Sequence, residues 1–151
     1  MRYQRLGDAW ILRLETDDEI FTTITRFAGE RAIDTATVSG IGAVHHVVLG
    51  YFDRVTRDYV RHSIEDDVEI VSLAGNIALK DGKPFPHLHV IVSGRDFQAK
   101  AGHLFEGKVG ATCEVVIKPL AGTVRRTKDE RTGLFLLDVG GVQTLDTTDK
   151  R

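Results

Sequence analysis

Three histidines, at positions 87, 89 and 103, are the residues of this 151-residue chain whose type and spacing best suggest ligand chemistry. His87 and His89 stand on either side of Leu88, just before Val90–Val92, a β-branched run that favours a strand. Side chains alternate along a strand, so both imidazoles should leave the same face and could converge on one ion. The pair therefore has the geometry of two metal ligands.

His103 could complete such a site. It follows Gly102, whose backbone freedom could aim the imidazole ring. Three histidines with water in a fourth position form an open site, and imidazole suits zinc, nickel, copper or iron better than magnesium or calcium. We expect a divalent transition metal, with zinc as the first choice. The alternative stays open, because His-x-His pairs arise often by chance, and on spacing alone ordinary strand histidines explain the pattern better.

Glu114 is the best candidate for an acid or base beside such a metal. It lies in the apolar run 112–118, where burial could raise its pKa toward the working pH. A carboxylate paired with an arginine or with backbone amides is an equal alternative. Glu106, three residues after His103, could be a ligand or a supporting residue, although a loop carboxylate is more often solvated. Cys113 is more typical of a small core residue than of a nucleophile.

Other polar motifs favour structural roles. His45 and His46 are adjacent, so on a strand they point to opposite faces and cannot share one site. The segment 39–42, Ser-Gly-Ile-Gly, is too short a glycine pattern for a nucleotide site and suggests a tight turn. Acidic residues interrupt the densest basic cluster, which predicts a solvated hairpin tip formed by Arg125, Arg126, Lys128 and Arg131.

Composition places the chain among average globular proteins, with 42% hydrophobic and 28% charged residues. A net charge of −2 gives no global positive field toward nucleic acid or an anionic membrane. No apolar run is long enough to span a bilayer or to act as a secretory signal, and a single cysteine cannot form an intrachain disulfide. We therefore expect a cytoplasmic protein.

The elements that must position these residues are mostly strands. A strand at 9–14 precedes a helix, for which Thr16 and Glu19 form a capping box and the apolar face runs from Ile20 to Ala28. Asp81-Gly82 indicates a tight hairpin between two strands. Residues 96–106 are interrupted by glycine and are read as a loop or short helix. Further strands are expected at 35–38, 46–52, 59–62, 68–79, 87–93, 112–118 and 134–138.

This pattern predicts an α/β (α+β) domain with an antiparallel-rich mixed β-sheet and one main flanking helix. We expect residues 1–140 to form a single domain and residues 141–151 to form a flexible C-terminal tail. The histidines should then lie on the sheet.

The stretch 86–117 resembles the plants-and-prokaryotes-conserved (PPC) domain family. It carries the His-x-His pair, the Gly-His-Leu at 102–104 and the Thr-x-Glu-Val-Val at 112–116, and the segments 38–44 and 71–79 are also similar to family segments. Ala101 is a departure, since family members often carry glycine there. The resemblance extends from about Met1 to Asp138.

The resemblance implies an antiparallel-rich sandwich, a homotrimer and, as in several prokaryotic members, a metal on His87, His89 and His103. Plant members bind DNA through a separate AT-hook, which this chain lacks. Two hypotheses follow: a metal-binding trimeric domain with a regulatory or DNA-associated role, or a small metalloenzyme in which Glu114 moves the proton. In either case we expect only weak DNA binding and no membrane partner.

Overall fold

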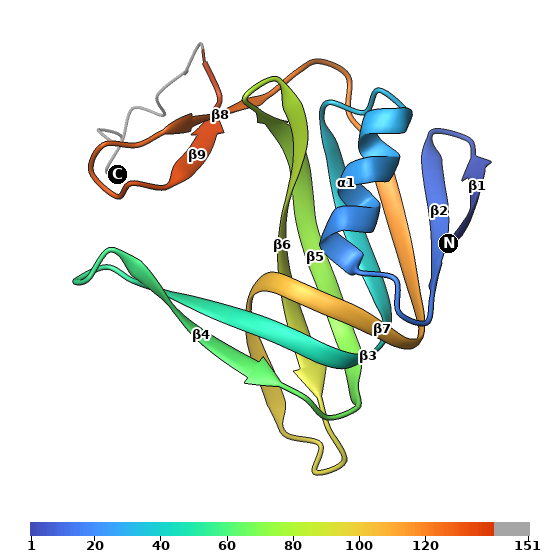
Figure 1. The fold of residues 1–151 in the computed structure, drawn as a ribbon. Helices are drawn as coiled ribbons and strands as arrows, with labels where there is room; N and C mark the ends of the chain where they lie inside the picture. The colour runs from blue at the N-terminus through green and yellow to red at the C-terminus, as the bar shows by residue number, and fades with distance from the viewer. Residues whose placement is uncertain (141–151) are drawn as a thin grey trace, which may run out of the picture.

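The computed structural model describes residues 1–140, so the predicted tail at 141–151 lies outside the described residues. Nine strands and one helix follow one another along this part of the chain (Figure 1). Their bounds are β1 Arg2–Leu6, β2 Ala9–Glu15, α1 Ile20–Glu30, β3 Ala36–Asp53, β4 Asp58–Ile64, β5 Val68–Lys80, β6 Lys83–Ser93, β7 Ala99–Pro119, β8 Arg125–Lys128 and β9 Phe135–Asp138. The predicted fold class, an antiparallel-rich mixed sheet with one helix, is confirmed.

All nine strands belong to one sheet, in which every pairing is antiparallel except the short contact of β8 with β5. The two longest strands, β3 and β7, each take part in two regions of the sheet. The first half of β3 lies between β5 and the end of β7, whereas its second half lies between β4 and the start of β7. The start of β7 also pairs with β6, which brings residues 89–93 beside residues 99–103.

The strand β3 bends where a tight turn was predicted. Residues 39–42 lie inside the strand, and the pairing with β5 shifts between Gly40 and Gly42. A side chain at Gly42 would overlap the carbonyl oxygen of Thr112, so glycine permits the close approach of β7. The prediction of a turn was wrong because a bulge and a turn leave the same glycine signal in a sequence.

The helix begins later than the capping box predicted. Glu19 is the N-cap, and its carboxylate accepts hydrogen bonds from the backbone N–H groups of Phe21 and Thr22. Thr16 instead donates to the carbonyl oxygen of Gly110. Glu19 also accepts from the N–H of Gly107, so the same carboxylate ties the helix start to β7. This contact between distant segments explains why the local motif misplaced the cap.

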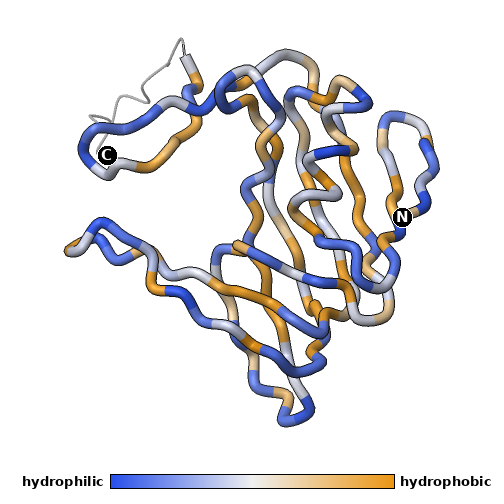
Figure 2. Tube along the Cα trace, in the orientation of Figure 1, coloured by the Kyte–Doolittle hydropathy of each residue, from blue (hydrophilic) through white to orange (hydrophobic). Residues whose placement is uncertain are grey.

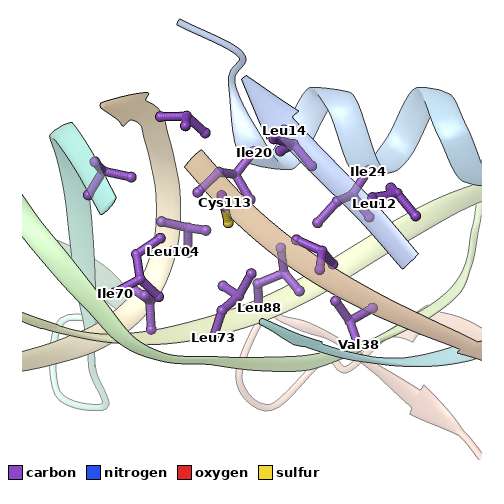
Figure 3. Packing of buried hydrophobic residues seen from close by; sticks show 14 of the residues in the cluster. Leu12, Leu14, Ile20, Ile24, Val38, Ile70, Leu73, Leu88, Leu104 and Cys113 are labelled. Carbon is purple, nitrogen blue, oxygen red and sulfur yellow. The ribbon is translucent and has the colours of Figure 1, made fainter. Parts of the chain in front are cut away.

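The core lies between α1 and the sheet. Ile20, Ile24 and Phe27 of the helix are fully buried. Ile20 and Ile24 lie among strand residues that include Leu12, Leu14 and Cys113 (Figure 3). Hydrophobic segments gather where the helix covers the strands, and the short strand β9 is also hydrophobic (Figure 2). Within residues 1–140, no helix is long and apolar enough to cross a membrane.

Two hairpins extend from the sheet on the same side of the molecule (Figure 1). One joins β3 to β4, and the other joins β8 to β9. The predicted hairpin at Asp81-Gly82 connects β5 to β6, and both turn residues have positive φ angles, 51° and 75°. Together these elements surround the part of β6 and β7 that carries the three histidines.

Candidate metal centre

His87, His89 and His103 come together on one face of the β6–β7 pair. His89 lies directly opposite His103 in the antiparallel register, and His87 is two residues along β6 on the same face. The three side chains offer ring nitrogens that all lie within 4.8 Å of one another, and the ring centroids are 5.0–5.5 Å apart. The sequence placed His103 in a loop or short helix, which was wrong, because Ala99–Pro119 is one continuous strand.

Two glycines allow the backbone to pack closely at this site. A side chain at Gly75 of β5 would overlap the carbonyl oxygen of His87. A Cβ at Gly102 would lie 2.8 Å from the carbonyl oxygen of Gly50 in β3. Gly102 is therefore required for a close backbone approach rather than for aiming the ring of His103, as the sequence had suggested.

Burial keeps His87 and His103 neutral near physiological pH. Burial and then the positive charge of Arg126 lower the pKa of His87 from 6.5 to about 4, with smaller effects from His103 and His89. Burial, then His89 and Arg126, lowers the pKa of His103 to about 4 as well. The Nδ1 atom of His103 is buried and has no hydrogen-bond partner among the described residues. Neutral imidazoles with free lone pairs are the form that binds metal.

The donor set fits a small transition-metal ion. Two nitrogens bound to one zinc ion at about 2.1 Å can be at most about 4.2 Å apart. In a tetrahedral site the nitrogens would be about 3.4 Å apart. The nitrogens of the trio, which lie within 4.8 Å of one another, would therefore need to approach by up to about 1.4 Å, which rotation of the side chains can supply. His87, His89 and His103 therefore fit a transition-metal ion.

A cavity of about 450 Å³ lies against two members of the trio, His87 and His103. Arg126 of β8 also lines it and is only 7% exposed, so the prediction of a fully solvated basic hairpin tip was wrong at this position. Arg125, Lys128 and Arg131 are exposed as predicted. Adjacent residues of a strand face opposite sides, so Arg125 and Arg126 point in opposite directions. The charge pattern alone did not indicate that one face of β8 is buried.

Glu114 does not join the trio. It is exposed, contrary to the burial expected from its apolar neighbours, and it lies on β7 opposite Ile41 of β3. Strands β3 and β5 separate this part of β7 from β6, which corresponds to about 14 Å across the sheet. Its neighbours Cys113 and Val115 face the core, whereas Glu114 lies at an alternate position of the strand and points outward.

The other polar candidates take structural positions. Glu106 is 57% exposed and approaches His46, which also contacts Glu65 at 2.8 Å. His45 lies 3.5 Å from Asp17. Cys113 is fully buried, which confirms the prediction of a core residue. Burial also raises the pKa of its thiol to about 12.

Fold and site together define a small α+β domain with a three-histidine centre on its sheet. The family model of the Plants and Prokaryotes Conserved (PCC) domain, also abbreviated PPC, matches residues 1–121, and the chain belongs to this family. The strands β8 and β9 lie beyond the matched residues. No curated protein matches the chain.

Solved structures share the whole fold. A metal-containing protein from Archaeoglobus fulgidus is 40% identical with a TM-score of 0.81, over 90% of this chain and 97% of that chain. A PPC protein from Pyrococcus horikoshii is 30% identical with a TM-score of 0.82, over 91% and 94% of the two chains. A proposed DNA-binding protein from Bacteroides thetaiotaomicron is 28% identical with a TM-score of 0.88, over 91% and 96%.

Proposed function

We propose that this protein has a PCC domain, formed by residues 1–140, that binds one divalent transition metal ion, with zinc as the first choice. His87, His89 and His103 would hold the ion, and their convergence within 4.8 Å is the observation that carries the proposal. Bound there, the metal would supply a Lewis acid with a position open to water or to a ligand oxygen. The 40% identical relative described as metal-containing supports the same conclusion.

Elemental analysis of the protein purified without chelators tests this proposal. We expect close to one transition-metal ion per chain, and we expect the double variant His87→Ala, His89→Ala to lose it. The matched control is His62→Ala, which removes an exposed histidine of β4 and should leave the metal content unchanged. A double variant that stays folded and keeps the wild-type metal content would contradict the assignment. The core does not involve these rings, so we expect the variant to fold.

Assembly as a homotrimer is part of the proposal. A groove on the outer face of the sheet is lined by Ile41, Val71 and Val116, which are 57%, 55% and 37% exposed. Exposed apolar patches of this kind mark interaction sites, and in a cyclic trimer each copy buries the same two surfaces against its two neighbours. A second copy of this chain is the occupant that the proposed trimer requires.

A small metalloenzyme is the second candidate, because the cavity beside His87 and His103 could admit a substrate. The position of Glu114 gives no support to its proposed role as acid or base, since it is exposed and lies three strands from β6. The enzyme hypothesis would need another proton carrier, such as water held at the open position.

We propose a regulatory or DNA-associated role for the protein in the cell, because two similar structures are proposed DNA-binding proteins. The net charge of −2 and the missing AT-hook favour weak, non-specific binding by this chain. A cytoplasmic location is also proposed, supported by a lone cysteine that is free and buried.

A further inference from the structure

The cavity beside the histidines has positively charged residues and no acidic residue in its described lining. Its volume is about 450 Å³, which lies in the range of small-molecule sites. His87 and His103 form one wall, and β9 contributes another. No Asp or Glu lines the cavity within the described residues. Its ligand should therefore be an anion.

Arg126 is a buried cation without a counter-charge among the residues that the structure describes. One of its Nη atoms donates to Oδ1 of Asn76 at 2.6 Å, and the other donates to the carbonyl oxygen of Phe135 at 3.2 Å. Both acceptors are neutral, and within residues 1–140 no carboxylate forms an ion pair with Arg126. Its Nε–H is buried and has no partner there. Buried charges in folded proteins are normally paired, so this guanidinium has the capacity to bind an anion.

Lys80 adds a second positive charge to the same cavity. Its Nζ lies 3.9 Å from the ring centroid of Phe135 and 5.0 Å from that of Phe85, and both rings line the cavity. Contacts of this kind hold an ammonium over aromatic faces without neutralising it. Two cations thus face a cavity whose lining, within residues 1–140, carries no negative charge.

The remaining walls are apolar. Tyr59 and Phe105 pack edge to face with ring centroids 5.0 Å apart beside His103, and Leu134 and Leu136 line the side formed by the β8–β9 hairpin. Such walls favour a ligand with an apolar body rather than a bare inorganic anion. The planar guanidinium of Arg126 matches the two oxygens of a carboxylate.

We infer that this cavity binds a small organic monocarboxylate, with its carboxylate on Arg126 and its apolar body against the aromatic walls. The inference rests on the proposed function in one respect, because two of the proposed metal ligands form a wall of the cavity. It names the class of ligand that would approach the open metal position. Arg126 lies beyond the residues that the family model matches.

Calorimetric titration of the full chain with benzoate and butyrate tests the inference, with benzamide and butyramide as uncharged controls and inorganic phosphate as a second anion. We expect the carboxylates to bind at least tenfold more tightly than their amides, and benzoate to bind more tightly than phosphate. Arg126→Gln should weaken benzoate binding by roughly tenfold to a hundredfold, the range of a hydrogen bond to a charged group. Arg125→Gln, the exposed neighbour on the same strand, is the matched control and should change nothing.

The metal content of each sample, measured in parallel, separates the two proposals. Benzoate binding that depends on Arg126 in a chain that holds no metal would support the inference and contradict the metal site. Full metal content without benzoate binding, or equal binding of benzoate and benzamide, would overturn the inference. Benzoate would fail to bind if a carboxylate from a second copy of the chain already occupied the cavity. If Arg126→Gln does not fold, Lys80→Gln decides: a loss of roughly threefold or more supports the inference, and unchanged affinity contradicts it.

Discussion

The metal-free protein should lose stability as the pH falls from about 7.5 to about 5. The pKa of His87 and of His103 is about 4 in the folded chain, compared with 6.5 for an ordinary histidine. In this window the unfolded chain therefore binds protons that the folded chain does not. Protonation then favours unfolding, so the free energy of unfolding falls as the pH decreases below 6.5, and the loss levels off below pH 4.

The size of this effect follows from the two pKa values. Between pH 7.5 and pH 5, each histidine would contribute at most about 2 kcal/mol. Both rings keep some exposure to water, and each pKa includes repulsion by other groups of the site, so we expect about 2 kcal/mol for the pair together.

Urea denaturation with a chelator present measures this loss. The double variant His87→Asn, His103→Asn should have a flatter dependence of unfolding free energy on pH, whereas His62→Asn, on the exposed face of β4, should behave like the parent. The reasoning is refuted if the double variant and the parent lose the same free energy over this range.

Three further predictions follow from the packing and the surface. Gly75→Ala should cost about 2–4 kcal/mol of unfolding free energy in thermal or urea denaturation, because the new Cβ overlaps the carbonyl oxygen of His87, whereas Gly29→Ala in an open part of α1 should be neutral or stabilising. Light scattering should give the mass of a trimer for the wild type and a smaller mass for Ile41→Arg. Val55 is 92% exposed at the tip of the β3–β4 hairpin, so Val55→Arg should leave the trimer intact. A monomeric wild type at micromolar concentration would contradict the trimer. Titration of labelled A·T-rich and G·C-rich duplexes at physiological salt should show weak binding without preference, and tight A·T-selective binding would favour the regulatory hypothesis instead.

The sequence predicted the parts of the fold and site that depend on local periodicity. Strand alternation put His87 and His89 on one face, and Asp81-Gly82 marked the β5–β6 hairpin, since both signals arise within a few residues. The strand that carries His103 was missed because its glycines look like loop residues. Their role is visible only from β3, where Gly102 meets the backbone of Gly50.

A contact between distant segments explains the error at Arg126, and strand alternation explains the error at Glu114. Arg126 is buried because β8 returns to β5 and places its side chain beside Asn76, fifty positions earlier in the chain. Glu114 is exposed because its strand presents only alternate residues to the core. The alternation of Cys113, Val115 and Ile117 on one face was a local signal for Glu114, whereas the residues next to Arg126 carry no such signal.

Anomalous diffraction from crystals of the protein grown with zinc, recorded on both sides of the zinc edge, tests the central claim most directly. The account predicts one strong zinc peak per chain, within about 2.1 Å of a ring nitrogen from each of His87, His89 and His103. The absence of a peak between these rings, or a peak only at other residues, would contradict it.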